Sequence, residues 1–318
     1  FYEEDLAIGL EATCECHECY VGNRCESLEE NCTVDVTTVE MSFGREFFEG
    51  KSEIDISSAY HLDYLDNPTW LYGSTNRISS KLNETIRKLH DRVGNLPEPS
   101  SSYQLVVGAG AMQLLTASVA SLAKLSNASS CDLAVQRPYW GEFQDIATAL
   151  SPRVRWYDNS QTEACTIEIV TSPNNPNGKL CEPKFNTSLE IFDYVYNWPS
   201  FRGNLSDVEN DSKPPIIIFS LSKLTGYAAS RFGWAFVRDR DVAQAMDSYI
   251  FINGQGSSVE AQYRAIRILQ TIMNDTEVSF FDFVRDRLTL RWNRLINVLA
   301  DQDILSIDGV PNQLFAWL

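Results

Sequence analysis

Residues 216–234 read IIIFSLSKLTGYAASRFGW, and this stretch organises the rest of the chain. The β-branched run at residues 216–219 predicts a buried strand, which passes directly into hydroxyls, a lysine and glycines. We expect burial at the mouth of this strand to lower the pKa of Lys223, so that its amine can act as a nucleophile or a base. Schiff-base chemistry needs such an amine. Ser220 and Arg231 add a hydroxyl and a fork of N–H donors, which suit an anionic phosphate.

Taken alone, this pattern also fits a strand that ends in a loop with a solvated lysine. Two motifs upstream favour the chemical interpretation: TSPNNPNG at residues 171–178, after another apolar run, and DYVY at residues 193–196. In this order and at these separations, the three motifs resemble the fold-type I enzymes that use pyridoxal phosphate. More closely, they resemble the alliinase and tryptophan-aminotransferase-related family of plants. The resemblance implies an α/β, aspartate-aminotransferase-like fold and pyridoxal phosphate as the cofactor.

The composition argues against several other classes of protein. A chain of 318 residues with 44% hydrophobic residues can bury a large core. Its net charge of −17 opposes binding to nucleic acid. No segment approaches the ~18 consecutive apolar residues of a membrane span. His17, His61 and His90 are too scattered for a metal cage or a catalytic triad, and we interpret them as surface or structural residues.

The hydrophobic pattern from residue 76 onward predicts alternating helices and strands, and therefore a largely parallel α/β sheet. The expected strands are residues 103–107, 131–135, 154–156, 166–170, 216–220 and 233–237. The expected helices are residues 76–93, a helix that ends near Lys124, and residues 143–150, 189–197, 241–252, 260–273 and 278–299. Residues 202–213 read as an exposed polar loop.

The cysteines are unevenly placed along the chain. Five of the eight cluster near the N-terminus, at Cys14, Cys16, Cys19, Cys25 and Cys32, whereas Cys131, Cys165 and Cys181 are dispersed. Such a cluster predicts a disulfide-stapled module, with zinc binding as the alternative. Its spacing, C-x-C-x2-C-x5-C-x6-C, resembles the EGF-like module that precedes the catalytic domain in alliinases. The resemblance implies an EGF-like module at residues 1–35 and, at residues 36–318, a pyridoxal-phosphate-dependent large domain with an incomplete C-terminal small domain.

Glycosylation signals point to the secretory pathway. Seven N-x-S/T sequons begin at Asn31, Asn83, Asn127, Asn186, Asn204, Asn210 and Asn274. Together with the cysteine cluster they favour an oxidising, vacuolar or extracellular location and N-linked glycans over a cytosolic zinc site. The chain begins at Phe1 without a charged and then apolar leader, so we expect a signal peptide to have been removed or left out.

The remaining motifs follow predicted strands, and ligands of an open α/β sheet bind at the carboxyl ends of its strands. Residues 108–113, GAGAMQ, open a predicted helix whose free N–H groups can face a phosphate. They match neither G-x-G-x-x-G nor a P-loop, which argues against a nucleotide site. By resemblance to the family, Ala111 and Met112 hold the phosphate of the cofactor, together with Ser220 and Arg231.

The resemblance also assigns residues to the cofactor's ring. Trp140 matches the aromatic residue that stacks on the pyridine, with an aromatic core residue as the alternative. Asn175 and Tyr196 match the donors to the phenolic oxygen. Asp193 matches the carboxylate that keeps the pyridine nitrogen protonated. We expect Asp193 and Tyr196 to lie on one helical face, because they are three residues apart.

The implied chemistry centres on Lys223, which anchors the cofactor and then removes the Cα proton of an amino-acid substrate. In one route, a carbon–sulfur lyase of the alliinase type β-eliminates S-alkyl-L-cysteine sulfoxides to sulfenic acid, pyruvate and ammonia. We prefer this route because the EGF-like module and the sequons match that branch of the family. A tryptophan-type aminotransferase, which uses the same residues, is the first alternative.

A catalytically inactive, secreted binding protein is the second alternative. The family runs on through a further segment with an arginine for the substrate's α-carboxylate, and this sequence ends at Leu318. Tyr72, preferred here over Trp70, matches a residue that crosses to the phosphate of the partner subunit. The resemblance therefore implies a homodimer.

Overall fold

The computed structural model describes residues 20–22, 27–28, 45–48, 78–96, 99–157, 165–185, 187, 189–202, 214–274 and 279–300. The chain divides into two compact units, Phe1–Glu40 and Met41–Leu318. In the first unit, the short strands β1 (Tyr20–Val21) and β2 (Ser27–Leu28) pair antiparallel. The five clustered cysteines, Tyr72 and the loop at residues 203–213 lie outside the described residues, so the EGF-like module and the roles assigned there stay predictions.

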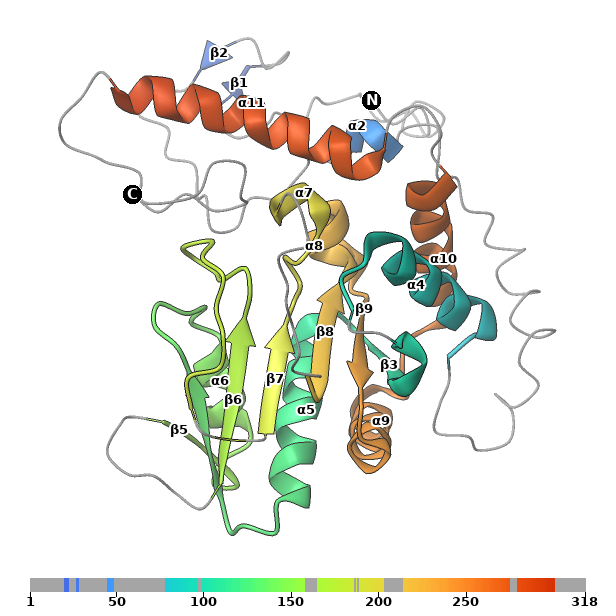
Figure 1. Ribbon diagram of the computed structural model, residues 1–318, viewed down its shortest axis with the longest axis vertical. Helices are drawn as coiled ribbons and strands as arrows, with labels where there is room; N and C mark the ends of the chain where they lie inside the picture. Colours follow the sequence, from blue (N-terminus) through green and yellow to red (C-terminus); the bar gives the residue numbers. More distant parts are fainter. Residues whose placement is uncertain are drawn as a thin grey trace. The chain divides into compact units, whose positions relative to one another are not determined.

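The second unit is built on a seven-stranded sheet with the strand order β3-β9-β8-β7-β6-β4-β5 (Figure 1). Its strands are β3 (Gln104–Gly108), β4 (Cys131–Val135), β5 (Val154–Trp156), β6 (Thr166–Thr171), β7 (Leu189–Asp193), β8 (Ile216–Ser220) and β9 (Gly233–Val237). Strand β9 runs antiparallel to both of its neighbours, and the other pairs are parallel. The predicted α/β sheet, largely parallel, is confirmed.

Helices cover both faces of this sheet and make two cores. The helices α5 (Ala111–Leu125), α6 (Phe143–Ala149) and α9 (Arg240–Gly254) bury their apolar residues on one face. The other core joins α2 (Arg45–Phe48), α4 (Ser80–Val93), α7 (Pro199–Arg202), α10 (Val259–Asn274) and α11 (Phe280–Ala300). In β8, Ile216 and Ile218 belong to the first core whereas Ile217 and Phe219 belong to the second, as the two-residue period of a strand requires.

One predicted element is wrong. Residues 189–197 do not form a helix, because residues 189–193 are strand β7 and a turn follows, in which the N–H of Asn197 donates to the carbonyl of Tyr194 at 2.9 Å. A strand buried between parallel neighbours carries a short apolar run, which periodicity alone does not distinguish from a helix. Asp193 and Tyr196 therefore do not share a helical face: Asp193 ends the strand and Tyr196 lies in the turn.

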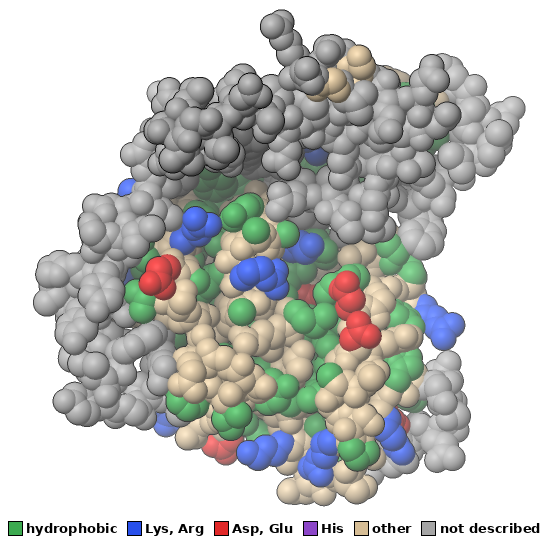
Figure 2. Space-filling view, turned by 180° about the vertical axis from the view of Figure 1, so that it is seen from behind, with side chains coloured by type: hydrophobic (Ala, Val, Ile, Leu, Met, Phe, Trp, Pro, Cys, Tyr) green, Lys and Arg blue, Asp and Glu red, His purple; other side chains and the backbone are tan. Residues whose placement is uncertain are grey.

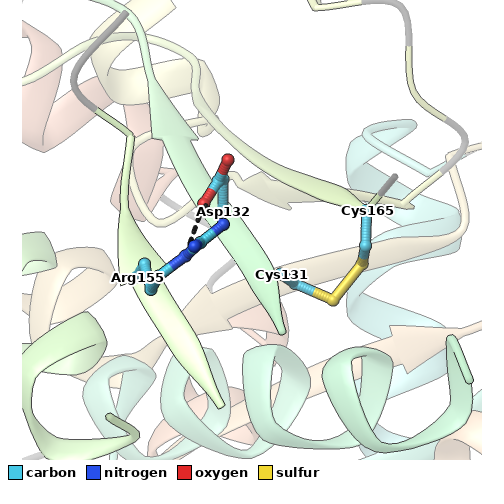
Figure 3. Close-up of polar contacts among 4 residues, drawn as sticks. All are labelled: Cys131, Asp132, Arg155 and Cys165. Carbon is cyan, nitrogen blue, oxygen red and sulfur yellow. Dashed lines mark hydrogen bonds and ion pairs between the residues drawn. A yellow bond between two sulfur atoms is a disulfide. The ribbon is translucent and has the colours of Figure 1, made fainter. Parts of the chain in front are cut away.

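A disulfide and an ion pair tie the outer strands together (Figure 3). Cys131, the first residue of β4, is bonded to Cys165, directly before β6, with the two Cα atoms 4.7 Å apart. Asp132 accepts from Arg155 of β5 at 3.0 Å. Because β4 lies between β5 and β6, these two contacts hold all three strands in register. Cys181 is a free thiol.

A buried network around His90 links α4 to the turn after β7. The indole N–H of Trp234 donates to Nε2 of His90 at 2.9 Å, so the proton of the neutral ring lies on Nδ1, 2.6 Å from the side-chain oxygen of Asn95. The amide nitrogen of Asn95 donates to the carbonyl of Asn197 at 2.8 Å. Burial lowers the pKa of His90 to about 3. His90 is therefore a structural residue, as expected, whereas His17 and His61 lie outside the described residues.

Three features would mark a protein that binds a membrane, a metal or a nucleic acid: a membrane-spanning helix, a metal-binding cluster and a continuous basic surface. None of the helices in the described ranges combines the length and the hydropathy of a membrane-spanning segment. The same ranges hold no group of three or more His, Cys, Asp or Glu side chains that could bind a metal ion. In the view of Figure 2, basic side chains are spread over several places among hydrophobic and neutral groups, so the described residues on that face form no continuous basic surface.

Candidate active site

The motifs found in the sequence converge at one edge of the sheet. The register aligns Gly108 of β3 with Gly233 of β9, and Gly233 with Ser220 of β8. Because β9 is antiparallel, its first residues lie beside the last residues of β3 and β8. Arg231, two residues before β9, is thereby brought next to the loop that enters α5.

The N-terminus of α5, at Ala111 and Met112, and the guanidinium of Arg231 form a group of donors that we call the cup. Gly110 is its N-cap and has no side chain to accept from the first N–H groups, and among the described residues no acceptor lies on the N–H groups of Ala111 and Met112. The guanidinium of Arg231 donates to the carbonyls of Ala228, at 3.1 Å, and Ala109, at 3.4 Å. Free amide N–H groups, the helix dipole and a fixed guanidinium together suit a phosphate.

Two glycines allow this close approach. Gly110 has φ +85°, and a Cβ atom there would lie 3.1 Å from Nη2 of Arg231. At Gly233, a Cβ atom would lie 2.9 Å from the carbonyl oxygen of Phe219, a backbone atom that cannot move aside easily. A larger residue at either position would push the cup apart.

A one-turn helix, α8 (Leu221–Thr225), presents Lys223 directly after β8. The hydroxyl of Ser220 caps this helix by accepting from the N–H of Ser222 at 3.2 Å, and Gly226, in the left-handed conformation, ends it. The amine of Lys223 lies 5.7 Å from the centre of the Tyr196 ring. Burial lowers the pKa of Lys223, and the carboxylates of Asp193 and Glu142 oppose that shift. The sequence-based expectation of a perturbed lysine at the strand mouth agrees with this environment.

Asp193 is the buried carboxylate of the site, with a side chain only 4% exposed. Its Oδ2 accepts from the hydroxyl of Thr171 at 3.4 Å, whereas its Oδ1 is buried and, within the described part of the chain, has no hydrogen-bond partner. Burial raises its pKa to about 6, although the N–H of Val195 and the charge of Lys223 act in the opposite direction. An unpaired carboxylate oxygen in such a place is costly unless a ligand donates to it.

Asn175 and Tyr196 come together on the same side of the site. The amide nitrogen of Asn175 lies 3.5 Å from the hydroxyl of Tyr196, whose pKa is raised by burial and by Asp193. Trp140 lies in the turn after β4, half-buried, and its ring packs edge-on against Phe143 at 5.5 Å. Part of the Trp140 ring is therefore anchored to the core.

The structure adds residues that the sequence reasoning did not single out. Thr171 contacts Asp193 because β6 and β7 pair in that register, and it could have been found once residues 189–193 were recognised as a strand. Glu142 is an exposed carboxylate whose charge acts on both Lys223 and Tyr196, and no motif marks it. Burial and Asp145 raise the pKa of Glu142, and Lys223 lowers it.

Known proteins with similar sequences fall into one family. Residues 43–318 match the family model Alliinase_C, described as allinase. Tryptophan aminotransferase-related protein 3 of Arabidopsis thaliana is 34% identical over 316 residues, which cover 93% of this chain and 66% of that protein. Alliin lyase of Allium cepa var. aggregatum is 30% identical over 322 residues, which cover 94% of this chain and 69% of that protein. The chain thus spans about two thirds of the length of the curated relatives it matches.

Solved structures show the same fold at low sequence identity. An aminotransferase from Staphylococcus aureus superimposes with a TM-score of 0.59 and 18% identity, covering 83% of this chain and 74% of that chain. The aspartate aminotransferase from Rhizobium meliloti gives a TM-score of 0.58 and 16% identity, covering 89% and 78%. Family and fold imply pyridoxal phosphate as the cofactor, and the unpaired oxygen of Asp193 fits its protonated ring nitrogen. The chain belongs to the Alliinase_C family and has the aspartate-aminotransferase-like, fold-type I architecture of pyridoxal-phosphate enzymes.

Proposed function

We propose that this chain belongs to a carbon–sulfur lyase of the alliinase type, which β-eliminates S-alkyl-L-cysteine sulfoxides to sulfenic acid, pyruvate and ammonia. The single observation that carries the proposal is the buried Oδ1 of Asp193, which has no hydrogen-bond partner among the described residues, together with the action of this carboxylate's charge on the amine of Lys223. A cationic N–H would stabilise a buried carboxylate oxygen that lacks a donor, and a partly buried lysine whose pKa is lowered can supply a neutral amine. The family match and the alliin lyases among the relatives support the lyase.

The cup and the ring residues would divide the binding of the cofactor between them. The N–H groups of Ala111 and Met112, the hydroxyl of Ser220 and the guanidinium of Arg231 would hold the phosphate. Trp140 would stack on the ring. These contacts place fixed donors and a flat apolar surface around the cofactor, which costs little reorganisation when it binds.

Three residues would set the charge of the ring. Asp193 would hold a proton at the pyridine nitrogen, while Asn175 and Tyr196 would donate to the phenolic oxygen. The cofactor, when bound, supplies an electron sink for the negative charge that develops at the substrate's Cα. Because burial raises the pKa of Tyr196, its hydroxyl keeps its proton and stays a donor.

Lys223 would anchor the cofactor and then move protons at the substrate's Cα. Its lowered pKa favours the neutral amine, which can accept the Cα proton. The charge of Asp193 opposes this lowering, so the amine regains a proton readily afterwards. The same residue can therefore act first as base and then as acid.

Transamination is the second candidate, because tryptophan aminotransferase-related proteins 3 and 4 of Arabidopsis thaliana share 34% and 32% identity with the chain. Lys223, Asp193 and Tyr196 serve both reactions, so the products must decide between them. An inactive binding protein is the remaining alternative.

The test mixes the protein, loaded with pyridoxal phosphate, with an S-alkyl-L-cysteine sulfoxide in the absence of any keto acid. Repeated turnover to pyruvate and ammonia is expected, with Lys223→Ala as the inactive control. Product that forms only with tryptophan and an added keto acid would replace the lyase by the aminotransferase. If the protein binds the cofactor but catalyses neither reaction, the inactive binding protein would be the remaining hypothesis.

We also propose that the protein enters the secretory pathway and reaches the vacuole or the outside of the cell. It would carry N-linked glycans and form a homodimer. The disulfide between Cys131 and Cys165 supports an oxidising compartment. Among the sequons, Asn127 is exposed in the turn between α5 and β4. Asn83 instead lies within α4, where its side chain accepts from Arg87 at 2.9 Å and the hydroxyl of Thr85 is buried.

Glycopeptide mass spectrometry of protein secreted from a eukaryotic host tests the location. We expect Asn127 to be occupied and Asn83 to be bare, because Asn127 is exposed in a turn whereas Asn83 is only partly exposed within a helix, where the hydroxyl of Thr85 is buried. Occupancy at neither site would count against the secretory pathway. Light scattering of the purified protein tests the homodimer.

A further inference from the structure

A hollow lies beside the carboxyl ends of β4 and β5, at the edge of the sheet that β5 forms. It encloses about 270 Å³, and its walls include the aromatic residues Tyr139, Trp156, Tyr157 and Phe185 and the cations Arg137 and Lys184. We name it the outer cleft. A space of this size accepts a molecule with one or two rings.

The aromatic residues are arranged as two packed pairs. The rings of Tyr139 and Trp156 are 5.2 Å apart and tilted by 55°, and those of Tyr157 and Phe185 are 5.2 Å apart and nearly perpendicular. All four are only partly buried, so each pair keeps ring surface open to the cleft. Flat π surfaces of this kind favour a planar aromatic ligand over an aliphatic one.

The two cations of the outer cleft have no competing partner within the described ranges. The side chains of Arg137 and Lys184 are exposed, and neither makes an ion pair or a side-chain hydrogen bond with a described residue. An unpaired guanidinium and an unpaired ammonium at the rim of an aromatic hollow suit a carboxylate, to which they can donate charge-assisted hydrogen bonds.

Contacts within the protein hold the walls of the outer cleft in place. Glu168 of β6 is fully buried, and its two carboxylate oxygens accept from the N–H groups of Lys184, at 2.9 Å, and Phe185, at 3.0 Å. This pins the loop after β6 against the strand. The disulfide and the Asp132–Arg155 ion pair hold β4, β5 and β6 beneath it (Figure 3). A preformed site loses less free energy to ordering when it binds.

We propose that the outer cleft binds a planar aromatic carboxylate, at a site separate from the candidate active site. Asp193 ends β7, and β6 lies between β7 and β4. Neighbouring strands are about 4.8 Å apart, so the end of β7 lies roughly 10 Å from the end of β4. Tyr139 and Trp140 are consecutive, so one turn of the chain contributes to both places. The proposal does not depend on which reaction the enzyme performs.

Isothermal titration of the cofactor-loaded protein with 2-naphthoate tests the proposal. Binding is expected. Two related compounds separate the contributions of the charge and of the ring: 2-naphthylmethanol lacks the charge, and cyclohexanecarboxylate lacks the aromatic ring. Each is expected to bind at least about tenfold more weakly, because it loses either the charge-assisted contacts or the stacking. Equal affinity for all three probes, or no heat with 2-naphthoate, would overturn the proposal.

A matched pair of double variants locates the binding. Arg137→Gln with Lys184→Gln is expected to weaken 2-naphthoate at least about tenfold. Lys124→Gln with Arg240→Gln removes the same charge from exposed positions on α5 and α9 and is expected to leave the affinity unchanged. Binding that survives the first pair but is lost in Lys223→Ala would move the ligand to the active site and reject the outer cleft. The visible absorption of the bound cofactor, recorded in each variant, reports separately on the proposed function.

Discussion

Two regions of the sheet bury a carboxylate, and they treat it in opposite ways. Next to the outer cleft, both oxygens of the buried Glu168 accept backbone N–H groups, so the protein itself pairs the charge. At the end of β7, Oδ1 of Asp193 is left without a partner among the described residues. Burying an unpaired carboxylate costs free energy, which the fold accepts only where a ligand restores the missing donor. Glu168 therefore stabilises the fold, whereas Asp193 is available to a ligand.

The largest expected effect is on activity, in Asp193→Asn. The amide is nearly the same size but cannot hold a proton on the pyridine nitrogen, so we expect the rate to fall by a factor on the order of 10³. The thermal stability of the cofactor-free variant should stay equal or rise, because a neutral amide is easier to bury. Steady-state kinetics and thermal melts on the same sample check this. A variant that melts earlier and keeps its activity would reverse the roles given to the two carboxylates.

His90 shows what a completely paired buried group does to pH dependence. Its pKa falls from 6.5 to about 3 on burial, so the unfolded chain takes up a proton first as the solution is acidified. The stability that this residue contributes is fully present above pH 6.5 and is lost as the pH falls through about 3. The loss amounts to roughly 5 kcal/mol in all, of which roughly 4 kcal/mol falls above about pH 3.5, since each pKa unit is worth about 1.4 kcal/mol.

Urea titrations from pH 7 down to pH 3.5 measure that loss. His90→Gln is expected to unfold more easily at pH 7 because it breaks the contacts to Trp234 and Asn95, and to show a flatter dependence on pH. A pH profile as steep as that of the unaltered protein would assign the acid sensitivity to other groups.

Glu168→Ala removes the paired carboxylate. It leaves the N–H groups of Lys184 and Phe185 without their acceptors, and we expect a loss of about 3 kcal/mol in the free energy of unfolding. The variant should keep most of its activity when folded, because the hydrogen bonds that Glu168 accepts from described residues come from Gln136, Lys184 and Phe185, which lie outside the candidate active site. Glu168→Gln, which keeps one acceptor, is the matched control and should lose less. Loss of activity in both, without loss of stability, would contradict the structural role.

The parts of the site that a local pattern specifies could be predicted from the sequence. The run from Ile216 to Ser220, followed by Lys223, predicts a buried strand and a desolvated amine, because hydrophobicity and residue type suffice for both. The helix predicted over β7 was wrong because LEIFD is too short to show a period. The disulfide could not be deduced, since its cysteines are 34 residues apart and meet only through the order of the strands.

The smallest expected effect concerns Asp193 itself, in the protein without cofactor. Its pKa rises from 3.8 to about 6 on folding, so the unfolded chain gives up its proton first as the pH is raised. The unaltered protein should lose roughly 2 kcal/mol relative to Asp193→Asn as the pH rises from about 4.5 to about 7.5, with most of the loss below about pH 6. Chemical denaturation of both proteins at pH 4.5, 6 and 7.5 measures the difference. Added pyridoxal phosphate should reduce this difference in stability, because a cationic ring N–H can donate to Oδ1. A difference that does not change when the cofactor is added would mean that Asp193 does not face the ring.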